Sequence, residues 1–129
     1  MLAIDTNVVI RFLTRDHEAA ARRALEIFSD GDVFVPMTVI LEAEWVLRDA
    51  YELPRGEVIR ELRRFCSMER VTVGSAEVVR RALDYAEQGL DVADALHLAQ
   101  ATECEAFVTF DKALAKRASP LRGTAIRLA

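Results

Sequence analysis

The chain has 129 residues, of which 52% are hydrophobic and 29% charged, and its formal net charge is −4 at pH 7. This length can bury a real core, and the acidic balance argues against a general nucleic-acid coat while leaving room for an enzyme that acts on nucleic acid. No apolar run is long enough for a membrane span, and no secretory signal is evident. Cys66 and Cys104 stand far apart without a CxxC pair, which is typical of reduced structural cysteines in a cytoplasmic protein.

Short apolar runs alternate with longer amphipathic segments along the whole chain. Residues 2–4 predict a buried strand, and Thr6 or Asn7 can cap the helix that follows, as Asp16 can cap the next. Further strands are predicted at 33–35, 71–73, 106–110 and 125–127, and further helices at 17–29, 38–52, 54–68, 75–88, 91–104 and 111–117. This alternation predicts an α/β fold with a mostly parallel sheet and helices on both faces. No linker or repeat interrupts it, so we expect a single domain over residues 1–129.

Four acidic residues from four separate segments fall near one predicted edge of this sheet. Asp5 follows the first strand and Asp111 follows the fourth, and open α/β sheets place ligand chemistry at the carboxyl ends of their strands. Asp94 lies in the first turn of a helix that begins at Asp91. Glu42 lies in an otherwise apolar helix start, where a buried acid is costly unless a cation or hydrogen-bond donors satisfy it. Mg²⁺ or Mn²⁺ prefers oxygen ligands and relieves the repulsion between such acids, so the sequence predicts a hard-metal site.

Each of these acids also has a purely structural interpretation. Asp91 suits a helix N-cap, with Asp94 three residues later as in a capping box, and Asp111 can cap the last helix. Glu44, two residues past Glu42, is expected to face away into solvent. The coincidence of four acids near one edge favours the chemical interpretation over four independent structural ones.

The ordered set of motifs resembles PIN-domain nucleases and, more narrowly, the VapC toxins of bacterial and archaeal toxin–antitoxin pairs. The resemblance covers nearly the whole chain. The matching stretches are Asp5-Thr6-Asn7 after an apolar strand, Val39-Ile40-Leu41-Glu42, Asp91-Val92-Ala93-Asp94-Ala95-Leu96-His97, and Thr109-Phe110-Asp111-Lys112.

The resemblance implies a PIN-like α/β/α sandwich with a mostly parallel central sheet of about five strands. It implies a Mg²⁺- or Mn²⁺-dependent endoribonuclease that acts on RNA, forms a homodimer and is inhibited by a small VapB-like antitoxin. It also implies a catalytic and metal-binding quartet, to which Asp91 is a possible fifth member. The quartet consists of Asp5, Glu42, Asp94 and Asp111.

Other polar residues take supporting roles in this interpretation. Thr6, Asn7 and Thr109 match positions that hold the acids in place. Arg11 and Lys112 are candidates for contacts with substrate phosphates, against the alternative of solvated surface charges.

Two further residues near these motifs have open roles. His97 shares a helical face with Asp94, so it can transfer protons or simply pack. Trp45 can stack on a base, pack in the core, or line a groove for an antitoxin helix, and Phe12 has the same alternatives.

Three alternatives remain from other classes of protein. A haloacid-dehalogenase-like phosphotransfer domain expects a second Asp where Asn7 stands, and a receiver domain expects an acidic pair and a late Lys that are not evident. A DNA-cleaving relative of the flap nucleases shares the metal chemistry but needs extra helical elements. A non-catalytic dimeric interaction module, whose acids bind a basic partner, is the non-enzymatic alternative.

Overall fold

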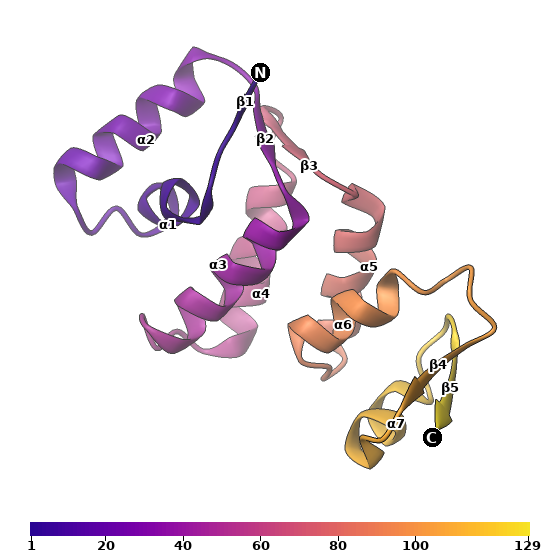
Figure 1. Ribbon diagram of the computed structural model, residues 1–129. Helices are drawn as coiled ribbons and strands as arrows, with labels where there is room; N and C mark the ends of the chain where they lie inside the picture. Colours follow the sequence, from indigo (N-terminus) through magenta and orange to yellow (C-terminus); the bar gives the residue numbers. More distant parts are fainter. The chain divides into compact units, whose positions relative to one another are not determined.

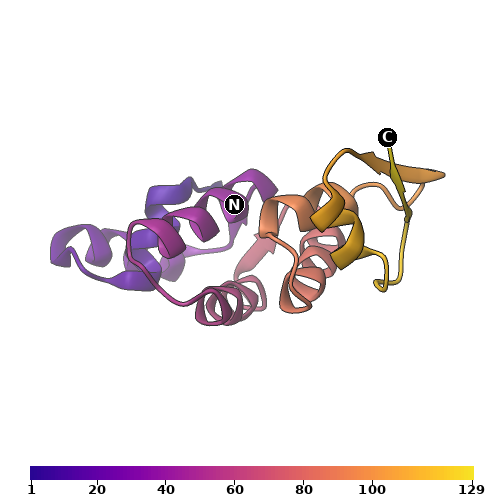
Figure 2. The same cartoon turned by 90° about the horizontal axis from the view of Figure 1, so that it is seen from below.

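A computed structural model describes residues 1–129, and the chain divides into two compact units, Met1–Ala76 and Glu77–Ala129. Figures 1 and 2 show the elements of each unit in two views. None of the helices combines the length and the apolar composition that a membrane crossing requires.

The first unit is built on a parallel sheet of three strands in the order β1-β2-β3. The strands are β1 (Leu2–Ala3), β2 (Val33–Val35) and β3 (Val71–Val73). In the register of the sheet, Val33 lies opposite both Leu2 and Val71. Val33 and Val35 are completely buried, as expected of the middle strand.

Four helices accompany this sheet. They are α1 (Thr6–Thr14), α2 (Glu18–Asp30), α3 (Met37–Asp49) and α4 (Arg55–Cys66). The rings of Phe12 and Phe28 stack with their centroids 4.1 Å apart, and Phe65 of α4 lies about 6 Å from each. Phe12 therefore packs in the core, which is one of the alternatives predicted for it.

The second unit contains a two-stranded parallel sheet. Its elements are α5 (Ala76–Glu87), α6 (Val92–Ala99), β4 (Ala106–Thr109), α7 (Lys112–Ala118) and β5 (Ala125–Leu128). β4 and β5 pair from Ala106 opposite Ala125 to Thr109 opposite Leu128, and α7 packs on both strands. Figure 1 shows these three elements together at the C-terminal end of the chain.

A loop of the second unit is fixed by a buried tyrosine. The Tyr85 hydroxyl of α5 donates a hydrogen bond of 2.8 Å to the carbonyl of Arg122. The next residue, Gly123, has a φ of +146°, and a Cβ atom built on it lies only 2.5 Å from the Tyr85 hydroxyl. Both the backbone conformation and the close approach therefore require glycine here.

The structure confirms the α/β class, the five strands and their parallel pairing, but the strands form a three-stranded and a two-stranded sheet instead of one central sheet. The helix predicted over 91–104 is too long, because α6 ends at Ala99. The Thr124 hydroxyl donates 2.6 Å to the carbonyl of Ala101, and the amide of Cys104 donates to the same carbonyl in a tight turn. These two hydrogen bonds satisfy the carbonyl of Ala101, so this group needs no partner from a further helical turn.

Candidate metal-binding and nuclease site

In the first unit, Asp5 stands between the first strand and the first helix. Its backbone is extended, and its Oδ1 accepts a hydrogen bond of 3.2 Å from the amide of Val8, which makes it the N-cap of α1. Ile4 before it is buried, whereas the Asp5 side chain is exposed. The change from strand to helix thus holds an accessible carboxylate at the carboxyl end of β1.

Thr6 connects this segment to α3. Its side chain is buried, and its hydroxyl donates a hydrogen bond to Oε1 of Glu42. Glu42 is exposed on α3, so the carboxylate is held by a buried donor and still reaches solvent. Glu42 is therefore hydrogen-bonded to the residue that directly follows Asp5 in the chain. Asn7 follows on the same helix and is exposed.

The predicted orientation of the two glutamates of α3 is wrong. Glu44, expected in solvent, is only 2% exposed, and Arg48 one turn later donates 2.8 Å from Nε to its Oε1. The helix buries a stripe that includes Ile40 and Leu47, and Glu44 lies on that stripe at i+4 from Ile40. The side chain that looks solvated in the sequence is therefore the buried one, and its charge is balanced by an arginine.

In the second unit, Asp91 and Asp94 share the first turn of α6. Asp91 Oδ2 accepts hydrogen bonds from the amides of Ala93 at 3.1 Å and Asp94 at 3.5 Å, so Asp91 is the N-cap that the sequence suggested. Burial raises the pKa of Asp94, and the negative charges of Asp91 and Asp111 raise it further, whereas His97 opposes the shift. The Asp94 carboxyl therefore feels the negative charge of both Asp91 and Asp111.

Asp111 follows β4 as Asp5 follows β1. Its Oδ1 accepts 3.0 Å from the amide of Leu114, which makes it the N-cap of α7. The Thr109 hydroxyl accepts a hydrogen bond of 3.0 Å from the amide of Asp111 itself. The turn between β4 and α7 is thus fixed from both sides of the aspartate.

The donor set suits a hard divalent cation. Every predicted ligand offers carboxylate oxygens, and the capping bonds of Asp5, Asp91 and Asp111 engage only one oxygen of each group. Neither unit by itself gathers three Asp, Glu, His or Cys side chains closely enough to hold an ion. Each unit thus supplies part of the predicted ligand set, namely Asp5 and Glu42 in the first and Asp91, Asp94 and Asp111 in the second.

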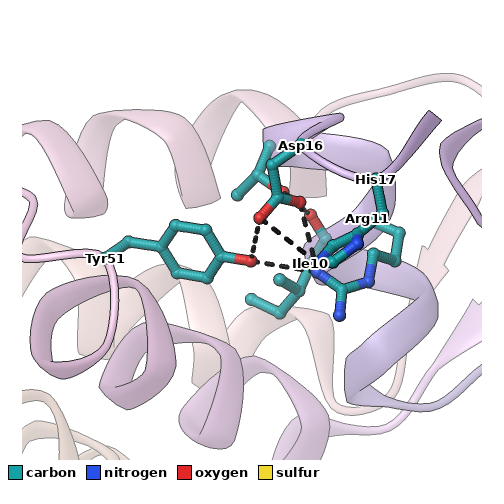
Figure 3. Close-up of polar contacts among 6 residues, drawn as sticks. Ile10, Arg11, Asp16, His17 and Tyr51 are labelled. Carbon is teal, nitrogen blue, oxygen red and sulfur yellow. Dashed lines mark hydrogen bonds and ion pairs between the residues drawn. The ribbon is translucent and has the colours of Figure 1, made fainter.

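The two predicted phosphate contacts have different surroundings. Lys112 is exposed on α7. Arg11 instead belongs to a network in which its Nη1 donates 3.1 Å to both Asp16 Oδ1 and the Tyr51 hydroxyl, and Tyr51 donates 2.8 Å to Asp16 Oδ2. Figure 3 shows the side chains of Arg11 and Tyr51 turned toward the Asp16 carboxylate. Much of the donor capacity of Arg11 is therefore used within the protein.

The Asp16 network was not predicted. The sequence suggested Asp16 as the cap of the second helix, but α2 begins at Glu18 after His17, and no side chain caps it. Asp16 instead accepts hydrogen bonds from Thr14 at 2.8 Å and from Tyr51, and these hydrogen bonds lower its pKa to about 2. The only local signal was the pair of polar residues at 14 and 16, because Tyr51 lies 35 residues farther along the chain.

His97 and Trp45 both reach the surface. His97 is exposed on α6, one turn after Asp94, and Trp45 on α3 is 54% exposed. The packed alternative predicted for each of them is therefore wrong: both side chains are open to solvent.

Fold and site together describe an α/β protein with parallel strands and carboxylates that cap helices directly after two of those strands, where α/β folds hold ligands. The profile of the PIN domain family matches residues 2–120 and so includes all of the predicted acids. The chain therefore belongs to the PIN domain family, which is generally a metal-dependent nuclease fold that acts on nucleic acids. A comparison with curated proteins gives no match.

Proposed function

We propose that this protein is a Mg²⁺- or Mn²⁺-dependent endoribonuclease of the VapC toxin kind, which hydrolyses phosphodiester bonds of RNA in the cytoplasm. The observation that carries the proposal is the repeated use of an aspartate as the N-cap of the helix that follows a strand, at Asp5 and at Asp111, in a chain of the PIN family. Each of these carboxylates is held by its helix through one oxygen.

In this proposal the acids act as ligands of a divalent cation. The ligands are Asp5, Glu42, Asp94 and Asp111, with Asp91 as a further candidate. The negative charges of these carboxylates offset the positive charge of the cation, and the cation in turn attracts the substrate phosphate. A bound cation lowers the pKa of a water for attack on phosphorus and stabilises the leaving oxygen.

The polar neighbours keep these carboxylates in position. Thr6 restricts rotation of the Glu42 carboxylate through its hydrogen bond, and Thr109 fixes the backbone at Asp111. Neither cysteine supports an alternative nucleophile, because burial raises the pKa of Cys66 to about 11 and keeps it a thiol, and Cys104 lies outside the acidic segments.

The test is cleavage of total RNA with Mg²⁺ or Mn²⁺, against EDTA and against Asp5→Asn and Asp94→Asn variants. We expect discrete, metal-dependent cleavage that falls by about 100-fold or more in either variant, since each removes a charged ligand. Asp49→Asn, which neutralises an exposed acid on α3, is the matched control and should cleave normally. Undiminished cleavage by Asp5→Asn and Asp94→Asn would show that the proposed ligand set is wrong.

We further propose that a VapB-like antitoxin neutralises the enzyme. A cavity of about 370 Å³ between α1 and α2 supports a docking place for an apolar helix, because Val8, Ala20, Ala24 and Ile27 line it. Arg23 also lines it and favours an acidic residue on the partner helix. An Ala20→Glu variant should still cleave RNA but resist inhibition by the cognate antitoxin. Full inhibition of that variant would argue against this groove.

We also propose a homodimer. The exposed indole of Trp45 on α3 supports an interface there, since large exposed aromatic side chains are enriched in the buried centres of protein interfaces. Light scattering after size-exclusion chromatography should give twice the chain mass of 14.4 kDa for the native protein, and a lower mass for Trp45→Ser. A monomeric native protein contradicts this assignment without affecting the nuclease test.

A further inference from the structure

The lysines of this chain are confined to one short helix. Of the 17 lysine and arginine residues, only Lys112 and Lys116 are lysines, and both lie on α7. Residues four apart share a helical face, so the two ammonium groups are neighbours. Both line a groove of about 610 Å³ between α7 and β5.

Apart from Ser119, the rest of this groove is lined by apolar residues. Ile126 and Leu128 alternate along β5 and therefore point to the same side of the strand, and Pro120 completes the floor. Leu128 is 49% exposed, so its side chain adds accessible apolar surface to the groove. The groove is of the size that small ligands and single building blocks of polymers occupy, roughly 300–1,000 Å³.

The charges of the groove select an anion. No acidic residue is among its lining residues, so two positive charges stand over an apolar floor in a chain whose net charge is −4. A ligand that complements this arrangement carries negative charge and a flat apolar face. A nucleotide of an RNA strand has both, in its phosphates and its base.

We propose that the groove between α7 and β5 is a subsite for one unpaired nucleotide of the RNA substrate, with the base on Ile126 and Leu128 and the flanking phosphates at Lys112 and Lys116. The inference rests on the proposed ribonuclease function. Asp111 directly precedes Lys112 and caps α7, so a nucleotide bound here lies close to Asp111. A base within a duplex cannot reach the apolar floor, because its faces are stacked on its neighbours. The subsite therefore selects RNA that is unpaired next to the cleavage point.

The restriction of lysine to this groove permits a direct test by amine footprinting. Asp94→Asn protein, which avoids cleavage, is treated with an amine-acylating reagent alone, with a short single-stranded oligouridine, and with the same strand annealed to oligoadenosine. Mass spectrometry then reports acylation at Lys112 and Lys116, with the amine of the exposed Met1 as the internal reference. We expect the single strand to reduce acylation of both lysines several-fold, and the duplex to leave it unchanged.

Binding measurements on variants complete the test. Lys112→Gln with Lys116→Gln should weaken binding of the single strand about tenfold and reduce the slope of log Kd against log salt by about 1.4, since two phosphate contacts are lost. Arg117→Gln, which neutralises a neighbouring exposed charge of α7 outside the groove, should bind normally. Leu128→Ser should reduce the preference for the single strand over the duplex. Circular dichroism checks that each variant is folded.

Several outcomes would overturn the subsite. They are equal protection of the lysines by single strand and duplex, unchanged binding by the double lysine variant, and protection by an acidic peptide but not by RNA. Metal-dependent cleavage by a protein whose lysines stay unprotected rejects the subsite and leaves the proposed nuclease intact. Protected lysines in a native protein that cleaves no RNA support the subsite and reject the nuclease.

Discussion

The Thr6 hydroxyl donates a hydrogen bond to Glu42, which joins the first turn of α1 to α3 and places a buried donor behind an exposed carboxylate. Sequence separation between the two residues is 36, so the bond fixes the relative position of two helices as well as one side chain. A donor that orients a ligand typically affects metal affinity or activity by 10- to 100-fold without contacting the ion.

A Thr6→Val variant tests this role because it keeps the side-chain volume and removes the hydroxyl. We expect RNA cleavage to fall by about 10- to 100-fold and the metal concentration for half-maximal activity to rise. The free energy of unfolding should fall by only about 1 kcal/mol, the usual value for one hydrogen bond. Thr6→Ser, which keeps the donor, should restore activity. Equal metal dependence of Thr6→Val and native protein would contradict the positioning role.

The Asp16 network predicts a specific dependence of stability on acid. Hydrogen bonds from Thr14 and Tyr51 hold the pKa of Asp16 at about 2, below its ordinary value of 3.8. A lowered pKa means that the carboxylate stabilises the folded state above about pH 4, and that this contribution is lost as the pH falls toward 2. Thermal melts between pH 2 and 5 should therefore show a steeper loss of Tm for native protein than for Asp16→Asn. Asp32→Asn, an exposed acid, should follow the native curve.

The two cysteines should differ in reactivity. Burial raises the pKa of Cys66 from 9.0 to about 11, whereas the Cys104 side chain is exposed. Since the thiolate is the reactive species, an alkylating reagent at pH 8 should label Cys104 and spare Cys66 in the folded protein. Peptide mapping gives the measurement, and labelling in denaturant gives the reference for full access.

The same shift has a consequence at high pH. A folded-state pKa above the unfolded value means that the neutral Cys66 thiol stabilises the fold below pH 9, and that this contribution is lost as the pH rises toward 11. Cys66→Ala should remove that part of the alkaline loss of stability, at the cost of a small cavity. An identical alkaline slope in native and variant protein would show that the thiol is not the group responsible.

The loop at Gly123 should not accept a side chain. Gly123→Ala brings a Cβ atom to 2.5 Å from the Tyr85 hydroxyl at a φ of +146°, so the loop or the tyrosine must move. We expect the free energy of unfolding in urea to fall by about 1–3 kcal/mol. Tyr85→Phe, which removes the hydroxyl and its hydrogen bond, should cost about 1 kcal/mol and reduce the further cost of Gly123→Ala. Simple addition of the two effects would mean that the residues are not coupled.

The sequence predicted those features that depend on neighbouring residues. Strands 33–35 and 71–73 agree with the structure to the residue, because short apolar runs bounded by turn or charged residues leave little choice of register. The N-cap at Asp91 could be predicted for the same reason, because an aspartate before an apolar helical pattern can accept hydrogen bonds from the free amides of the first turn.

Features that depend on distant residues were not predictable in this way. The Thr124 hydroxyl bonds the carbonyl of Ala101 just after α6, and the Tyr51 hydroxyl bonds Asp16, which does not cap α2. The buried charge of Glu44 is balanced by Arg48. A hydropathy pattern counts both residues as polar and so does not reveal this pairing. The roles of the acids stay predictions, because capping and ligation require the same residue type at the same place.

That double use has a practical consequence for Asp5, Asp91 and Asp111, which cap α1, α6 and α7. Asparagine caps a helix about as well as aspartate does, since its amide oxygen accepts the same backbone bond, but it carries no charge. An Asp→Asn substitution therefore removes the negative charge at each position and keeps the helix cap. Under the proposed function, Asp5→Asn and Asp111→Asn proteins should stay folded without cleaving RNA, and they can then be used to capture substrates and inhibitors.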